Sequence, residues 1–187
     1  MSLKSNAALL TSLIIFSAYS AVLHATAAST EPFVEILPVS TPDGAATRVK
    51  AVIEIDASPA AVWAVITDCT GAPKVIPHLE SCRIVEKDSS GSWDVREHII
   101  NPPFLPRIRT LVRNDFTLRQ RLAFKLQSGD MRISDGAWVL KLVNGRTRLS
   151  YEAIIAPKSS APQFIISRAI AQDFPAMLRA IQRASTP

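Results

Sequence analysis

The sequence lacks the short motifs that mark the common enzyme classes. It has no G-x-S-x-G nucleophile elbow, no glycine-rich phosphate loop, no C-x-x-C and no pair of histidines at metal-ligand spacing. With only 3 histidines and 2 cysteines in 187 residues, a zinc site would need carboxylates that the pattern does not assemble. These absences weaken a hydrolase, nucleotide-binding or zinc-enzyme interpretation, and we expect neither a metal nor a cofactor.

Long hydrophobic runs are also scarce, and the longest lies at the N-terminus. Lys4 precedes an apolar run over residues 7–23, and small residues at positions 25–28 offer a cleavage site. This pattern is typical of a secretory signal peptide over residues 1–28, and it predicts a secreted or periplasmic protein. The alternative is an uncleaved membrane anchor. The run argues against it, because it is short for a membrane span and is interrupted by Ser and Thr.

The composition fits one globular domain, since 48% of the residues are hydrophobic and 20% are charged. We find no internal repeat and assign that domain to residues 47–185. Residues 29–46 are rich in proline and polar residues, which predicts an irregular lead-in in which residues 33–37 can add one edge strand.

The chain is organised around residues 47–86. Alternating apolar positions from Val49 to Ile55 predict a strand with one inward face. Ser58 stands where a helix N-cap is expected and Pro59 at the first helical position, so a short helix follows to about Thr67.

Several weak motifs follow one another in a fixed order along the chain. They are Ser58, Pro59, Val62 and Trp63, then Asp68, then Ile76, Pro77, Leu79 and residues 83–85, then Gly136 with Trp138, then Thr147, Leu149 and Tyr151. Together they resemble the START-like (SRPBCC) superfamily, in particular its polyketide cyclase and coenzyme Q-binding branch. The resemblance implies an α+β helix-grip fold, in which a curved antiparallel sheet wraps around a long C-terminal helix, with two short helices between the first two strands and a hydrophobic pocket inside.

The rest of the chain reads as further strands and one closing helix. Strands are expected at 83–87, 93–100, 107–116 and 122–127, with another beginning at 131–133, and Asn144-Gly145 predicts a hairpin between 137–143 and 146–156. An apolar stripe predicts a helix after Pro162, and Pro175 within it predicts a kink or a break. Apolar side chains of each strand are expected to point inward, and His98 outward into solvent.

The expected pocket combines these inward faces with the helix stripe. Its predicted ligand-binding residues are Trp93, Val95, Glu97, Ile108, Phe124, Trp138, Leu140, Tyr151, Ile166, Ile170, Phe174 and Met177. Glu97 is the one charged member, and buried alone its ionised form would be costly. It is either a ligand-orienting or acid/base carboxylate, or it is turned out by a bulge or paired with an arginine.

Two further groups of residues allow alternative interpretations. Cys69 and Cys82 are expected to form a disulfide in an exported protein, the alternative being two buried thiols. Arg107, Arg109 and Arg113 form a basic strip. It lacks the interleaved aromatics of a nucleic-acid site, so it is a solvated sheet face or, with Phe104 and Leu105, a transient contact with anionic membrane headgroups.

These features predict an exported, monomeric protein that binds a hydrophobic small molecule, such as a lipid, a quinone or a polyketide-like compound. We expect it to do no chemistry. The alternative is a polyketide cyclase or aromatase that uses the same pocket, for which Glu97 and Tyr151 are the only acid/base pair that the pattern offers. A third hypothesis is a protein-interaction module that uses the arginine face.

Overall fold

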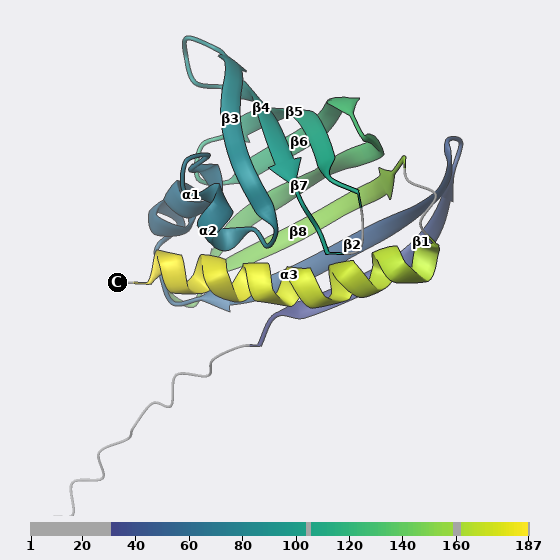
Figure 1. Cartoon of the computed structure of the whole chain (residues 1–187). Helices are drawn as coiled ribbons and strands as arrows, with labels where there is room; N and C mark the ends of the chain where they lie inside the picture. The colour runs from purple at the N-terminus through teal and green to yellow at the C-terminus, as the bar shows by residue number, and fades with distance from the viewer. Residues whose placement is uncertain (1–30, 104–105, 159–161, 187) are drawn as a thin grey trace, which may run out of the picture.

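The computed structural model describes residues 31–103, 106–158 and 162–186. It contains eight strands and three helices within these residues (Figure 1). In chain order they are β1 Phe33–Thr41, β2 Gly44–Ile55, α1 Pro59–Thr67, α2 Ala72–Val75, β3 Leu79–Lys87, β4 Trp93–Ile100, β5 Ile108–Thr117, β6 Arg121–Gly129, β7 Met131–Val143, β8 Arg146–Pro157 and α3 Gln163–Ser185. The predicted signal peptide lies outside the described residues.

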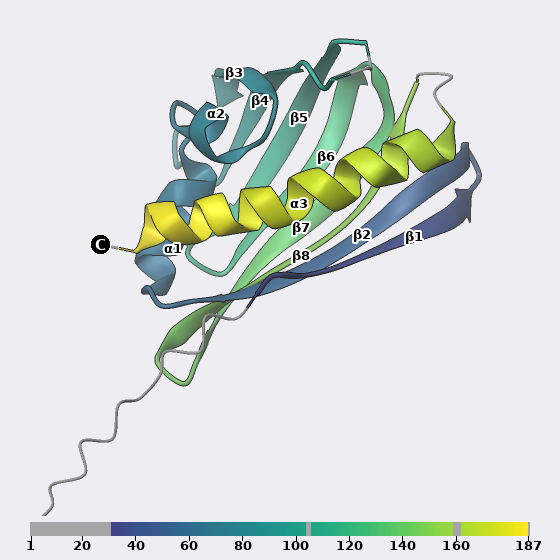
Figure 2. The same cartoon turned by 60° about the horizontal axis from the view of Figure 1, so that its bottom comes forward.

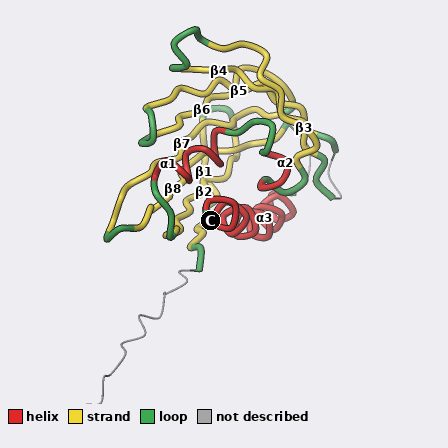
Figure 3. The backbone as a smooth tube through the Cα atoms, turned by 90° about the vertical axis from the view of Figure 1, so that its left-hand side faces the viewer, coloured by secondary structure: helices red, strands yellow, loops and turns green. Residues whose placement is uncertain are grey.

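The strands form one antiparallel sheet in the order β1-β2-β8-β7-β6-β5-β4-β3. The sheet curves around α3, which lies along its concave side (Figures 2 and 3). The helices α1 and α2 lie between β2 and β3 and close one end of the concave side (Figure 1). This arrangement confirms the predicted helix-grip fold, with the short helices after the second strand because β1 adds an edge strand.

Local sequence explains the elements on which the site depends. Ser58 caps α1 by accepting a hydrogen bond from the Ala61 N–H at 3.2 Å, as its position predicts. Gly136 in β7 lies opposite Ala153, and a Cβ at this glycine would lie 2.4 Å from the Glu152 carbonyl oxygen. The glycine of the family-like motif is therefore needed for the close approach of β7 and β8.

The core lies between the sheet and α3. Its fully buried members include Ile53 of β2, Leu149 of β8 and Leu178 of α3, each no more than 1% exposed. Val62 of α1 joins the same cluster. No helix within the described residues is both long and apolar enough to cross a membrane.

The structure differs from the predicted extents of four elements. Residues 33–46 are not irregular, because β1 pairs with β2 along its whole length. The third strand begins at Leu79, four residues earlier than predicted, and β7 is one continuous strand. The C-terminal helix is also continuous, with Pro175 inside it. Long-range pairing and packing extend these elements beyond what their local patterns indicate.

Candidate ligand-binding site

Two adjoining cavities lie between the concave face of the sheet and α3. The first has a volume of about 320 Å³ and the second about 440 Å³. They meet at residues that line both, which are Ile100, Ile108, Met131, Ile155, Asp173 and Phe174. Volumes of this size are typical of sites for small organic molecules.

An aromatic cluster forms one wall of the first cavity. The Tyr151 ring of β8 lies 4.5 Å from the Trp138 ring of β7 and 5.0 Å from the Phe174 ring of α3, measured between centroids. The Phe124 ring stacks on Tyr151 at 5.8 Å. Burial raises the pKa of Tyr151, so its phenol stays protonated. Tyr151 lines this cavity, as Trp138, Phe124 and Phe174 do.

A second part of the lining, here called the polar wall, comes from β4 and β5. Arg96, His98, Thr110 and Asn114 all line the first cavity. His98 lies directly across the strand pair from Thr110, so their side chains are neighbours on the same face. Burial lowers the pKa of His98 to about 4, and the charge of Arg96 adds to the effect. The imidazole is therefore neutral near pH 7.

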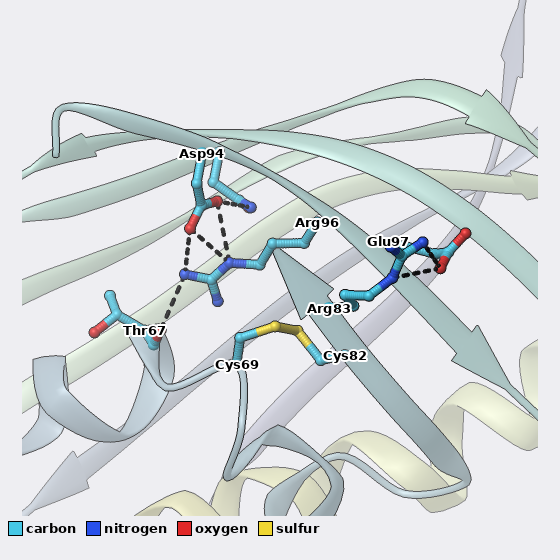
Figure 4. Close-up of a disulfide and its surroundings, with 8 residues drawn as sticks. Thr67, Cys69, Cys82, Arg83, Asp94, Arg96 and Glu97 are labelled. Carbon is cyan, nitrogen blue, oxygen red and sulfur yellow. Dashed lines mark hydrogen bonds and ion pairs between the residues drawn. A yellow bond between two sulfur atoms is a disulfide. The ribbon is translucent and has the colours of Figure 1, made fainter. Parts of the chain in front are cut away.

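A buried ion pair supports this polar wall (Figure 4). The Arg96 Nε donates to Asp94 at 2.9 Å, and the Arg96 Nη2 donates to the Thr67 carbonyl oxygen at 2.9 Å. The Asn114 amide donates to the second Asp94 oxygen at 2.7 Å. Because the carboxylate and the guanidinium satisfy each other, their burial is tolerated and the site carries no uncompensated charge from this pair.

The predicted disulfide is present between Cys69 and Cys82, whose Cα atoms lie 5.3 Å apart. It joins the segment after α1 to β3, close to the Thr67 carbonyl that Arg96 binds (Figure 4). The disulfide therefore fixes the end of α1 against the polar wall.

The structure reverses the predicted faces of β4. Trp93, Val95 and Glu97 do not line either cavity, whereas Arg96, His98 and Ile100 do. The expectation that His98 points into solvent is therefore wrong as well. Alternation shows that two faces of a strand differ, but a face made of mutually bonded polar groups can point inward.

Trp93 and Glu97 have partners on the face of β4 that is turned away from the cavities, here called the outer face. The Arg113 guanidinium lies 4.2 Å from the Trp93 ring centroid, and Val95 is buried away from the cavities. Glu97 accepts hydrogen bonds from Arg83 at 2.9 Å and from Arg109 at 2.7 Å. These bonds lower the pKa of the Glu97 carboxyl, so it stays ionised. The pair of Glu97 with Tyr151 does not exist as an acid/base site, and the predicted alternative of an arginine pair is the correct one.

The remaining predicted pocket residues divide between the two cavities. Ile108 and Phe174 line both, and Ile166 and Ile170 line the second. Those that line only the first are Phe124, Trp138, Tyr151 and Met177. Leu140 lines neither cavity, because it is buried in the core cluster.

The basic strip on β5 is engaged with acidic residues. Arg107 pairs with Glu80, Arg109 with Glu97, and Arg113 with Asp115. This pairing is typical of a solvated sheet face. Phe104 and Leu105, the apolar residues of the predicted membrane contact, lie outside the described residues.

The prediction from sequence left out the polar groups at the cavities, among them His98 and Asp173. Asp173 lies on α3 and contacts His78, with 3.4 Å between the Asp173 Oδ1 and the His78 Nε2. A signal for Asp173 was present, because it falls three residues after Ile170 and four before Met177, on the apolar stripe. No group of three or more potential metal ligands occurs within the described residues.

Comparison with known proteins identifies the family. The family described as polyketide cyclase / dehydrase and lipid transport matches residues 55–182. The chain belongs to this family. No curated protein matches the sequence at a significant level.

Several solved structures share the fold. A STAR-related lipid transfer protein from Xanthomonas axonopodis is 10% identical, with a TM-score of 0.69 over 83% of this chain and 93% of the other. Human STARD10 is 13% identical, with a TM-score of 0.66 over 83% of this chain and 69% of the other. The Zhui aromatase/cyclase from Streptomyces sp. R1128 is 16% identical, with a TM-score of 0.58 over 74% of this chain and 90% of the other. At these identities the likeness establishes the fold alone.

Proposed function

We propose that this protein binds an apolar, oxygen-bearing small molecule, such as a quinone, a lipid or a polyketide-like compound, in the cavities between the sheet and α3. The observation that carries the proposal is the pairing of an aromatic wall around Tyr151 with a polar wall around His98. Such a site provides apolar enclosure and a few hydrogen-bonding groups that orient the ligand. The family also includes lipid transport, and this supports a binding role.

Tryptophan fluorescence tests the proposal directly. Trp138 lines the first cavity while Trp93 lies on the outer face, so a Trp93→Phe variant should retain the response to 1,4-naphthoquinone. Phe174→Arg should abolish the response, since the new charge would be desolvated in the cavity or would occupy the ligand's place.

Phe164→Arg is the matched control, because Phe164 lies on the same helix but is 71% exposed. This variant should bind the quinone as the wild type does. Equal fluorescence changes in Phe174→Arg and Phe164→Arg would place the quinone outside the cavities and contradict the proposal.

A second candidate function is that of a cyclase or aromatase. The neutral imidazole of His98 at the first cavity favours it, because a base near a bound polyketone could remove a proton. If this function holds, His98→Gln should lower turnover of a poly-β-ketone by about a hundredfold. Glu97→Gln should leave turnover unchanged, because Glu97 lies on the outer face.

We also propose that the protein is exported, with cleavage near Ala28. The disulfide supports this proposal, because disulfides persist mainly in oxidising compartments. N-terminal sequencing of protein from the extracellular or periplasmic fraction checks it, and an intact Met1 in the membrane fraction would favour an anchor instead.

A further inference from the structure

Asp173 is the one acidic residue of α3, and it lies on the side of the helix that faces the cavities. Its neighbours on that side are Ile170, Phe174 and Met177, which are apolar. It lines both cavities, and so stands where they meet. Ile170 and Met177, on the same side of the helix, are buried hydrophobic residues that pack in the core. A carboxylate between them adds nothing to this packing.

The carboxylate is costly where it lies. Its side chain is 34% exposed, and burial raises its pKa, although His78 partly offsets the effect. The His78 Nε2 lies 3.4 Å from the Asp173 Oδ1. Because a third of the Asp173 side chain is exposed and the residue lines both cavities, its carboxylate can still accept a hydrogen bond from a ligand there.

His78 is held in place by its own backbone. Its φ of 61° lies in the left-handed region, which is uncommon for a residue with a side chain. Its carbonyl oxygen accepts a hydrogen bond from the Asn101 N–H at 2.8 Å. The turn before β3 thus places His78 next to α3, with its Nε2 3.4 Å from the Asp173 Oδ1.

We propose that Asp173 is the subsite that accepts a hydrogen bond from a hydroxyl group of the ligand, with His78 as its positioning residue. The proposal rests on the proposed function, because the subsite has no role without a ligand in the cavities. A neutral hydroxyl fits better than an ammonium group, since a cation would have to be desolvated among mostly apolar side chains. The ligand class is therefore an alcohol or phenol with a large apolar body.

The test compares two probes that differ in one donor, 1-naphthol and 1-methoxynaphthalene. Both carry the same rings and an oxygen, but only the naphthol donates a hydrogen bond. In the wild type the dissociation constant of 1-naphthol, measured by calorimetry, should be about tenfold or more lower than that of the ether, as expected for a hydrogen bond to a charged acceptor. Asp173→Leu should remove this preference and leave binding of the ether largely unchanged.

Three further variants separate a ligand contact from a structural effect. Asp173→Asn retains an acceptor oxygen and should keep part of the preference even if Asp173→Leu folds poorly. His78→Ala should reduce the ratio of the two dissociation constants, and His78→Gln, which retains a donor, should restore part of it. Gln172→Leu, at an exposed position of the same helix, should leave the ratio at its wild-type value.

The outcomes distinguish the two proposals. If both probes bind the wild type equally well, the Asp173 subsite is wrong while the cavity function stands. The same conclusion follows if the preference for naphthol survives in Asp173→Leu. If neither probe binds the wild type, the proposed function fails and the subsite fails with it.

Discussion

His98 makes the stability of this protein depend on pH at the scale of a single residue. Its pKa falls from 6.5 to about 4 on folding, mainly through burial. The unfolded chain therefore binds the proton more tightly. The stability that comes from keeping His98 neutral is fully present above pH 6.5 and is lost as the pH falls toward 4. The full difference between these pKa values corresponds to about 3 kcal/mol of unfolding free energy.

We predict that His98→Leu flattens this part of the pH profile. Urea denaturation of the wild type and the variant at pH 7, 5.5 and 4 gives the difference in unfolding free energy at each pH. That difference should shift in favour of the variant as the pH falls, because only the wild type must keep a neutral imidazole buried. Loss of the Glu97 ion pairs at low pH affects both proteins equally and cancels. Parallel profiles would show that His98 is solvated.

Two carboxylates, Glu97 on β4 and Asp173 on α3, have different surroundings at the scale of single residues. Glu97 is surrounded by Arg83 and Arg109, which lower its pKa and hold it on the outer face. Asp173 has a single histidine contact and faces the cavities. The sequence pattern singled out Glu97 because it interrupts an apolar set. Its actual surroundings, two arginine side chains on the outer face, could not be read from that pattern.

At the scale of elements, the disulfide connects α1 to the sheet. Closing the loop between Cys69 and Cys82, which are 13 residues apart, should stabilise the protein by about 3 kcal/mol in the chain-entropy model. We predict that replacing both cysteines by serine lowers the unfolding free energy by this amount.

Reduction provides a matched control for the disulfide. Dithiothreitol should destabilise the wild type to the level of the double serine variant and leave the variant unchanged. Titration of thiols in denatured, unreduced protein should give none. Two reactive thiols per chain in protein from an oxidising compartment would contradict the prediction.

At the scale of the whole molecule, the proposed ligand binding should stabilise the folded state. A ligand that binds only the folded state at a hundred times its dissociation constant stabilises that state by about 2.7 kcal/mol. For a domain of this size we predict a rise in melting temperature of roughly 5 to 10 °C with 1,4-naphthoquinone. Calorimetric melting measures the shift, which should be absent in Phe174→Arg and present in Phe164→Arg. A similar rise in both variants would indicate binding elsewhere.

The sequence by itself determined the order of the elements and the family. Strand alternation, the Ser58-Pro59 helix start and the Asn144-Gly145 hairpin are local signals, because each depends on residues within one element or turn. The apolar stripe of α3 was equally clear. This stripe and the inward sets of β5 to β8 together contain the eight predicted residues that line the cavities.

Only the tertiary structure decided which face of β4 meets the cavity and where the charged groups find partners. Asp94, Arg96 and Asn114 come from two strands, and the Thr67 carbonyl comes from the end of α1. Their mutual hydrogen bonds make an inward polar face stable, and no local pattern contains that information. The contact of His78 with Asp173 likewise joins residues 95 positions apart, which become neighbours only when the sheet curves around α3.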